Sequence, residues 1–246
     1  MNLQRHLQDI ANLRRLELMP LLFQYTGGRV QTGPFAGMTI VPRTCWGDGD
    51  TPAKLLGVYE NELHEFVDHA VKAKPDYLLN IGCAEGYYIV GLCRLLPHVT
   101  ADAVDISPTA IEICHENSLA NNVTGLNTTR DEITCEWIED KCHLPKKPLL
   151  IVDCEGAELT LLDPVKVPSL SKCSILVECH DCAIPGITDT LTQRFEETHT
   201  VQLMSQTTKD PYQFDFLKDL SDCDKWALVH EGRPSTMTWL YITPKS

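Results

Sequence analysis

Hydrophobic residues recur at helical spacing near the start of the chain. The pattern predicts a helix over residues 2–19 that is ended by Pro20. Its apolar positions are Leu3, Leu7, Ile10, Leu13 and Leu16. Residues 26–52 are instead rich in Gly, Pro and Thr and predict short strands and turns. We expect the large apolar side chains of this segment to be buried, namely Phe35, Met38, Ile40 and Trp46.

From residue 55 onward the pattern becomes an alternation of helices and strands. A helical pattern over 55–74 is stopped by Pro75, and further helices are expected over 86–96 and 108–120. Short apolar runs predict strands over 76–81, 100–106, 126–130, 148–155, 173–180, 199–205 and 237–244. Such alternation is typical of a doubly wound, mainly parallel α/β sheet.

The composition fits a soluble globular protein and excludes several partners. The chain has 246 residues, of which 43% are hydrophobic and 22% charged, enough for one large α/β domain or one domain with an appendage. No apolar run approaches the roughly 18 residues of a membrane span, and the N-terminus lacks a signal-peptide core, so we expect a cytoplasmic protein. The net charge of −13 disfavours nucleic acid and anionic membranes as partners.

The 11 cysteines do not indicate a disulfide framework. A chain of this size without a secretion signal favours reduced thiols. Cys179 and Cys182 have the spacing of a zinc ligand pair, but no second CxxC exists. A structural zinc site normally needs four ligands, so the sequence does not favour one.

The stretch "NIGCAEGYY", residues 80–88, lies between a predicted strand and a predicted helix. Gly82 and Gly86 let a ligand approach the backbone closely, although two glycines are also common in simple packing turns. Asp105 ends the next strand, where an acid can accept hydrogen bonds from both hydroxyls of an adenosine ribose. Ser107, rather than Asp105, is suited to cap the following helix. Together the loop and the acid predict an adenosine cofactor.

Two adenosine cofactors are compatible with this pattern. NAD normally requires a tight GxGxxG turn, whereas here Ala84 replaces the middle glycine. Glu85 would also repel a pyrophosphate but would tolerate the sulfonium and amino group of S-adenosylmethionine. The loop therefore favours S-adenosylmethionine over NAD.

Acidic and imidazole side chains collect at the ends of two predicted strands. The ends of parallel strands meet at one edge of a sheet, so we expect these groups to converge. The group comprises Asp153, Glu155, Glu158, Glu178, His180 and Asp181. His180 is the candidate general base, because its ordinary pKa lies near neutrality. Asp181 could orient His180, or Asp153 could serve as the base instead. As an alternative without direct support, a divalent ion bound by Asp153, Glu178 or Asp181 could acidify the acceptor hydroxyl.

Three segments carry a family resemblance. "YLLNIGCAEGYYIVGL", "AVDISP" and "IVDCEGAELTLLD" resemble class I S-adenosylmethionine-dependent methyltransferases, and DCEGAE is most similar to the FkbM-type branch. The likeness covers roughly residues 55–244. It implies a Rossmann-like seven-stranded sheet whose last strand is antiparallel, in a methyltransferase domain over 55–246. Residues 1–54 would form an N-terminal helical and irregular extension that serves as a lid, a substrate pocket or a dimer contact.

The resemblance also implies roles for individual residues. The loop residues Gly82, Cys83, Ala84, Glu85 and Gly86 would contact the methionine moiety. Asp105 would bind the ribose and Asp131 or Glu132 the adenine, and the cofactor-binding set also includes Ile106 and Asp153. The segment before the loop could place Tyr59 and Glu60 over the cofactor; the alternative is that Tyr59 packs in the core and Glu60 is solvated. The chain departs from the family pattern at Asn80 and Ala84, which affects how the amino-acid tail is held.

The family likeness implies methyl transfer to a hydroxyl of a small molecule or sugar, by a chain that can form homo-oligomers. N-methylation is also compatible with the sequence, because the glycine loop determines which cofactor binds and not which acceptor is methylated. A non-catalytic cofactor-binding or scaffold protein would keep the loop and Asp105 but would not need a histidine at the acceptor side. An NAD-dependent oxidoreductase is the third alternative.

Overall fold

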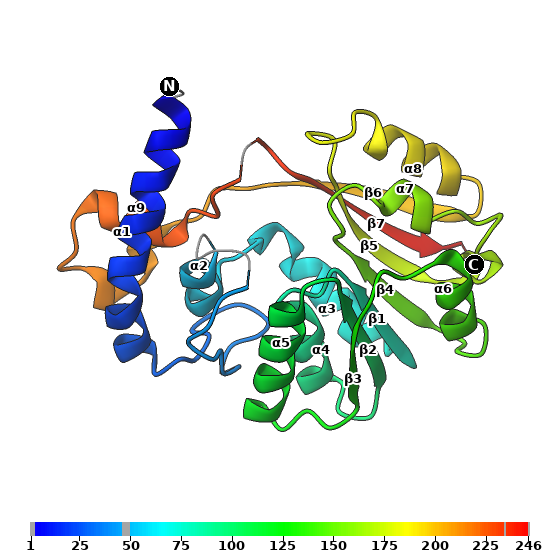
Figure 1. Ribbon diagram of the computed structural model, residues 1–246, viewed down its shortest axis with the longest axis horizontal. Coiled ribbons are helices and arrows are strands. Elements are labelled where there is room, and N and C mark those ends of the chain that lie inside the picture. The colour runs from blue at the N-terminus through cyan, green and yellow to red at the C-terminus, as the bar shows by residue number, and fades with distance from the viewer. Residues whose placement is uncertain (1–2, 46–49, 234, 246) are drawn as a thin grey trace.

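The computed structural model describes residues 3–45, 50–233 and 235–245, with side chains described from residue 9 onward. Seven strands form one sheet in the order β3-β2-β1-β4-β5-β7-β6 (Figure 1). The strands are β1 (Tyr77–Ile81), β2 (Thr100–Asp105), β3 (Leu126–Arg130), β4 (Pro148–Val152), β5 (Ser174–Cys179), β6 (His199–Ser205) and β7 (Thr238–Pro244).

The sheet is parallel except at one edge. β1 to β5 pair in parallel, while β7 pairs antiparallel with both β5 and β6. The expected Rossmann-like seven-stranded sheet with an antiparallel last strand is therefore confirmed. The strand order reverses direction between β1 and β4, which is the point where open α/β sheets bind ligands.

Helices cover both faces of the sheet. They are α1 (Leu3–Thr26), α2 (Thr51–Leu56), α3 (His64–Ala73), α4 (Tyr87–Leu95), α5 (Pro108–Ala120), α6 (Cys135–Cys142), α7 (Glu158–Leu161), α8 (Ile187–Phe195) and α9 (Asp222–Val229). Four 3₁₀ turns lie between them in the described residues, at Asn61–Leu63, Pro168–Lys172, Pro211–Gln213 and Asp215–Leu217.

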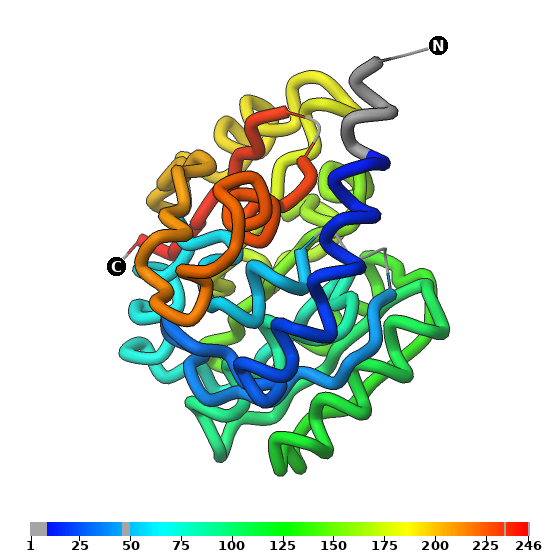
Figure 2. Tube along the Cα trace, turned by 90° about the vertical axis from the view of Figure 1, so that its left-hand side faces the viewer, coloured from blue at the N-terminus to red at the C-terminus, as the bar shows by residue number. Residues whose placement is uncertain are grey.

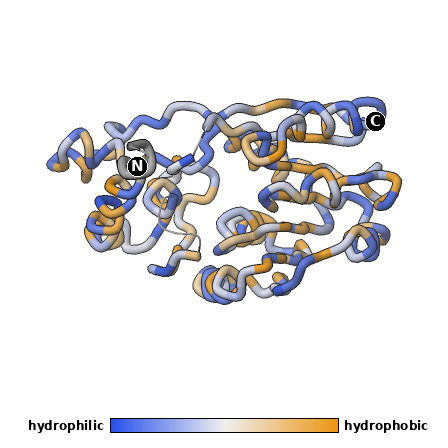
Figure 3. The backbone as a smooth tube through the Cα atoms, turned by 45° about the horizontal axis from the view of Figure 1, so that its top comes forward, coloured by the Kyte–Doolittle hydropathy of each residue, from blue (hydrophilic) through white to orange (hydrophobic). Residues whose placement is uncertain are grey.

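Each central strand sends alternate side chains into two hydrophobic cores. In β1, Leu78 belongs to the core under α3, α4 and α5, while Leu79 and Ile81 belong to the core under α6, α7 and α8. Burial on both faces explains why these strands read as continuous apolar runs. Figure 3 shows hydrophobic residues, in orange, along much of the backbone.

The prediction that Pro20 ends the first helix is wrong, because α1 continues through it to Thr26. A proline inside a helix costs about 3 kcal/mol, since it lacks an N–H and crowds the preceding turn. Here Pro20 and Leu16, whose carbonyl loses its partner, both lie on the exposed side of the helix. The turn beyond Pro20 buries Leu22 almost completely, which offsets the cost.

The first helix also buries a different face from the predicted one. Ile10 and Leu13 are more than 60% exposed, whereas Leu18 and Leu22 are buried. The helix packs along α9, and Arg14 binds Asp224 of that helix with nitrogen–oxygen distances of 2.7 and 2.8 Å. The two segments, 210 residues apart in sequence, run side by side in Figures 1 and 2.

Two other predictions for the N-terminal region need correction. Residues 27–45 form turns with one isolated bridge, Arg29–Thr39, instead of short strands, although Phe35, Met38 and Ile40 are buried as expected. Trp46 lies outside the described residues. The helix expected over 55–74 is broken between α2 and the 3₁₀ turn at Asn61.

The break begins at Gly57, whose backbone is left-handed with φ 78°. A Cβ at this position would overlap the backbone of Thr32, so only glycine allows the two segments to touch. The break places Tyr59 beside the sheet end and leaves Glu60 with φ 45°, a left-handed conformation that is uncommon for a non-glycine residue.

Within the described residues, no helix combines the length and apolar character that a membrane crossing requires.

Candidate functional site

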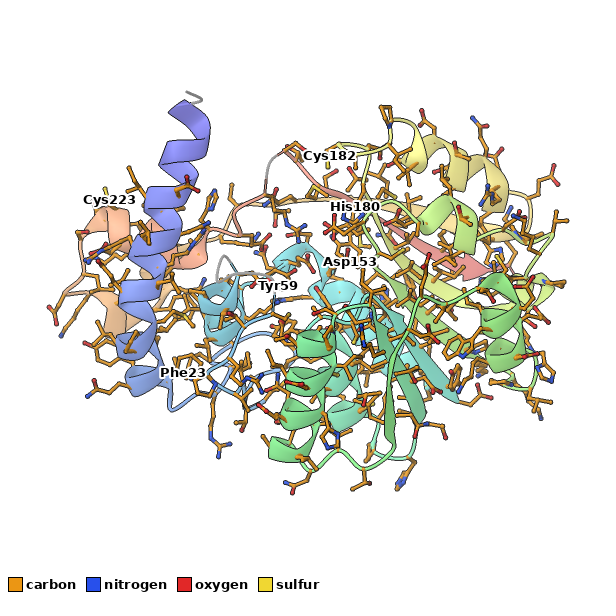
Figure 4. All side chains as sticks on the ribbon, in the orientation of Figure 1. Phe23, Tyr59, Asp153, His180, Cys182 and Cys223 are labelled. Atoms are coloured by element: carbon orange, nitrogen blue, oxygen red, sulfur yellow. The ribbon has the colours of Figure 1, made fainter. Side chains whose placement is uncertain are left out.

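A cavity of about 860 Å³ lies at the carboxyl ends of β1, β2, β4 and β5. Its size falls within the roughly 300–1,000 Å³ of small-molecule sites, and its position is the one expected for a doubly wound sheet. Predicted site residues that line it are Tyr59, Gly82, Ala84, Glu85, Asp105, Ile106, Asp131, Glu132, Asp153, Glu178 and His180. Glu60, Cys83, Gly86 and Asp181 were also predicted but do not line it. Asp153 and His180 lie close together in Figure 4, at the ends of β4 and β5.

The glycines of the loop are required by the protein itself. Gly82 has φ 73°, and a Cβ there would overlap the carbonyl oxygen of Asp153. Gly86 has φ 85°, and a Cβ there would lie 2.6 Å from Cys114 Sγ. The packing role that two glycines often have in such turns therefore applies to both residues. These glycines first let the loop pack against β4 and α5.

Asp105 ends β2 with its carboxylate directed at the loop. One oxygen accepts a hydrogen bond of 2.9 Å from Ala84 N–H, and the other accepts one of 2.8 Å from Ser107 N–H. Ser107 caps α5 as expected, since its side chain accepts from Ala110 N–H. A carboxylate has about four acceptor positions, so Asp105 retains capacity for ligand hydroxyls at the cavity wall.

Asp131 and Glu132 follow β3 and are exposed at the edge of the cavity. Glu132 N–H donates a 2.9 Å hydrogen bond to the Asp131 carboxylate. Ile106 and Ile133 provide apolar surface beside them. Acceptor groups next to an apolar wall are suited to the amino group and ring of an adenine.

A buried lysine lies beside the loop and was not predicted from the sequence. Lys54 of α2 pairs with Glu85 and, at 2.6 Å, with Asp50, and its ammonium group lies 4.5 Å from the centre of the Tyr59 ring. Burial lowers the pKa of Lys54, but the Asp50 and Glu85 carboxylates outweigh it and raise the pKa overall. Burial acts to raise the pKa of Glu85, and the Lys54 charge lowers it overall.

The Lys54–Glu85 ion pair removes one of the two reasons for disfavouring NAD. Glu85 was expected to repel a pyrophosphate, yet Lys54 neutralises its charge. Lys54 is a single lysine in an apolar helix, so no sequence pattern identifies its partner.

His180 is the centre of the acidic end of the cavity. Its Nδ1 lies 2.8 Å from Glu158 Oε1, while Nε2 lies 3.5 Å from Asp153 Oδ1 and 3.4 Å from Glu155 Oε2. Glu178 Oε2 is 3.9 Å from Nε2. The predicted convergence of acids and imidazole therefore occurs for five of the six groups, which we call the acid–imidazole cluster: Asp153, Glu155, Glu158, Glu178 and His180.

The sixth group, Asp181, was expected to orient His180 but points elsewhere. Its carboxylate accepts a 2.9 Å hydrogen bond from Gly186 N–H and contacts Thr188, at the start of α8. An acid at a helix N-terminus is favoured by the unpaired N–H groups there. The residue that holds the imidazole is Glu158, whose side chain is fully buried.

The cluster concentrates negative charge in a space that is buried at Glu158, Glu178 and His180 and open at Glu155. Burial raises the pKa of Asp153 to about 6, against the opposing effect of His180. Burial and the neighbouring Asp153 carboxylate raise the pKa of Glu178. For His180, burial lowers the pKa, but Glu158 and the other carboxylates raise it overall, which favours the imidazolium.

Arg233 closes the cavity beside this cluster and was also missed. It pairs with Glu60, Glu178 and, at 2.9 Å, Glu231, and its guanidinium lies 5.8 Å from the centre of the Tyr59 ring. Burial raises the pKa of Glu231 to about 7 despite an ion pair with Lys209. Glu60 therefore acts behind the cavity wall, through Arg233, instead of lying over a cofactor.

Among the described residues, one group has the spacing of a metal site. Asp153, Glu155 and His180 each offer a ligand atom, and these atoms lie within 4.8 Å of one another. Of the weak metal candidates named from sequence, Asp153 belongs to this group, whereas Asp181 does not and Glu178 is held by Arg233. Glu155 has φ 55°, a left-handed conformation that sets the direction of its side chain at the cavity rim.

No protein-family model matches the sequence, and no curated protein sequence matches it. Solved structures do show the same fold. An rRNA methylase from Streptococcus thermophilus superposes with a TM-score of 0.50 at 8% identity, covering 75% of this chain and 97% of the other. The O-methyltransferase TomG from Streptomyces achromogenes, in complex with S-adenosylmethionine, gives a TM-score of 0.49 at 13% identity, covering 76% and 81%. The chain thus shares with the rRNA methylase a Rossmann-like methyltransferase fold.

Proposed function

We propose that the chain is an S-adenosylmethionine-dependent methyltransferase of the FkbM type that methylates a hydroxyl of a small molecule or sugar. The observation that supports this most is the arrangement of one cavity. The loop over 82–86 and Asp105 lie on one side of it, and the acid–imidazole cluster lies on the other. Asp153 touches both, because its carbonyl packs against Gly82 and its carboxylate faces His180.

The cavity walls suit S-adenosylmethionine in shape and charge. Asp105 offers acceptors to the ribose, the apolar wall at Ile106 and Ile133 faces the adenine, and Asp131 or Glu132 accepts from its amino group. The acidic lining favours a ligand that carries a sulfonium and an ammonium group. When bound, S-adenosylmethionine supplies the methyl group. In the same arrangement, Lys54 fixes Glu85 and with it the conformation of the loop.

The acid–imidazole cluster performs the chemistry at the acceptor side. A hydroxyl oxygen that gains a methyl group must lose its proton. The neutral form of His180 or the ionised form of Asp153 accepts this proton, since both residues face the cavity. Glu158 holds the imidazole ring and stabilises its protonated form. Arg233 and Tyr59 close the space next to the cluster, which excludes water from the acceptor.

A ribosomal RNA acceptor, as in the name of one structural neighbour, fits this chain less well. The net charge is −13, and the cavity rim carries Asp131, Glu132 and Glu155, which would repel a phosphate backbone. The second candidate is a cofactor-binding protein without catalysis. The buried Glu158–His180 hydrogen bond argues against it, because binding the cofactor does not require an imidazole at the acceptor side.

The experiment is a methyl-transfer assay with S-adenosylmethionine labelled on the methyl group and a panel of sugars and phenols. His180→Ala should reduce transfer by about 10²–10⁴-fold, the usual contribution of a positioned proton acceptor, while S-adenosylmethionine affinity stays within about threefold. His98→Ala, at an exposed histidine that does not line the cavity, provides a matched surface control. Equal rates in His180→Ala and the parent chain would remove the cluster from the chemistry.

A further inference from the structure

We propose that Asp153, Glu155 and His180 bind a divalent cation at the acceptor side of the cavity. The three residues come from two neighbouring strand ends, after β4 and after β5, and their ligand atoms lie within 4.8 Å of one another. One nitrogen and two carboxylate oxygens form a donor set that is common for first-row divalent ions.

The spacing around His180 matches a coordination sphere better than a set of hydrogen bonds. Nε2 is 3.5 Å from Asp153 Oδ1 and 3.4 Å from Glu155 Oε2. Two ligand atoms at about 2.1 Å from a tetrahedral ion lie about 3.4 Å from each other. An ion can therefore sit between Nε2 and each carboxylate with little movement of the protein.

The imidazole is fixed in the orientation that a metal ligand needs. His180 is 4% exposed, and its Nδ1 is held by the fully buried Glu158. Nε2 is thereby directed at carboxylate oxygens, and within the part of the chain that the structure describes it makes no hydrogen bond. A carboxylate bound to the far nitrogen of a ligating histidine is the usual second layer of metal sites.

The charge balance of the cluster points to the same ligand. Three carboxylates, from Asp153, Glu155 and Glu178, face one buried ring nitrogen, and Arg233 reaches only Glu178 among them. Like charges that face the same group repel each other unless a cation is shared between them. A divalent cation would compensate Asp153 and Glu155 at once.

Solvent access leaves the site open for an acceptor. The Glu155 side chain is 85% exposed and that of Asp153 is 32% exposed, so an ion could enter from the cavity rim and keep further ligand positions free. Metal sites that act on substrates retain such open positions. Mn²⁺ and Zn²⁺ suit a mixed nitrogen and oxygen donor set, whereas Mg²⁺ prefers oxygen ligands and water.

The consequence for catalysis rests on the proposed function, whereas the binding itself does not. A hydroxyl oxygen that coordinates the ion loses its proton more readily. The His180 nitrogen that binds the ion then acts as a ligand, and the proton passes to solvent or to a carboxylate of the cluster that the ion leaves free. The two roles of His180 are thus separable by measuring metal binding directly.

The test uses the full chain, treated with a chelator, and titrates it with Mn²⁺ while free Mn²⁺ is followed by electron paramagnetic resonance. We expect one ion per chain, and competition by Zn²⁺. Glu155→Gln should weaken Mn²⁺ binding by at least tenfold, and Glu158→Gln by about 10–100-fold, the usual effect of losing an outer-layer partner. Glu197→Gln, an exposed glutamate outside the cavity, is the matched control and should bind Mn²⁺ normally.

Absence of saturable Mn²⁺ binding would overturn the proposal, as would equal affinity in Glu155→Gln and the control. Glu155 is exposed, so its variant should fold, and circular dichroism would verify this. A parallel titration with S-adenosylmethionine separates the two claims. Cofactor binding without Mn²⁺ binding refutes only the metal site, whereas Mn²⁺ binding without cofactor binding refutes only the methyltransferase proposal.

Discussion

Replacing Lys54 by methionine tests how the N-terminal region supports the cavity. Methionine keeps much of the apolar stem that packs near Tyr59 but removes the charge that faces Asp50 and Glu85. The Asp50 side chain is 30% exposed and can be hydrated, whereas that of Glu85 is 11% exposed. The variant therefore leaves one buried carboxylate without its cation.

Removing one partner of a buried ion pair costs about 3–5 kcal/mol, because the remaining charge stays desolvated. For a slope of about 3 kcal/mol per molar urea, the unfolding midpoint should fall by roughly 1–2 M. The double variant Lys54→Met/Glu85→Gln should recover most of this loss, since it leaves no unpaired charge at this position. Equilibrium unfolding in urea, followed by circular dichroism, measures all three proteins.

The pH dependence gives a second, independent readout. In the parent chain Lys54 lowers the pKa of Glu85, so the stability from this pair is present above the unfolded-state pKa of about 4.3 and lost as the pH falls through the lower folded-state value. Without Lys54, burial remains the largest influence on Glu85 and raises its pKa, against the smaller opposing effects of its backbone and Cys45 hydrogen bonds. The deficit of Lys54→Met should then shrink between pH 7 and pH 5, as Glu85 takes up a proton. A deficit below 1 kcal/mol, or one that the double variant does not recover, would refute this reasoning.

Three further predictions concern the two sides of the cavity. Asp105→Ala should weaken S-adenosylmethionine binding by about 1–3 kcal/mol in calorimetry, the cost of losing a hydrogen bond to a charged group; unchanged affinity would remove Asp105 from the site. Gly82→Ala should lower the thermal midpoint even without cofactor, because a Cβ overlaps the Asp153 carbonyl, whereas Gly27→Ala has open space and should cost less. Arg233→Met should leave Glu60 and Glu178 without their cation and destabilise the chain by about 3–5 kcal/mol, and normal urea unfolding of this variant would contradict the role given to Arg233.

The strands and helices of the sheet were predictable because each is determined by residues that are close together in sequence. Apolar runs, Ser107 before Pro108 and the glycine loop each specify an element within a few residues, and the structure places these elements as expected. The ends of parallel strands then meet by topology, so Asp105, Asp153 and His180 had to share one edge.

What the sequence did not reveal depends on contacts between distant segments. Lys54 meets Glu85 across 31 residues, and Arg233 meets Glu60 across 173. Neither Lys54 nor Arg233 belongs to a sequence motif, and each meets its carboxylate partner only when the chain folds. The continuation of α1 through Pro20 also depends on tertiary packing. The burial of Leu22 outweighs the tendency of proline to end a helix. The partner of His180 was misassigned because Asp181 is adjacent in sequence, whereas Glu158 is adjacent in space.

The most direct test of the account is calorimetric titration of the purified chain with S-adenosylmethionine, S-adenosylhomocysteine and NAD in parallel. We expect one site per chain for both adenosyl compounds, weaker binding of both in Asp105→Ala, and no measurable heat of binding for NAD. Binding of NAD in preference to both adenosyl compounds, with the same dependence on Asp105, would contradict it.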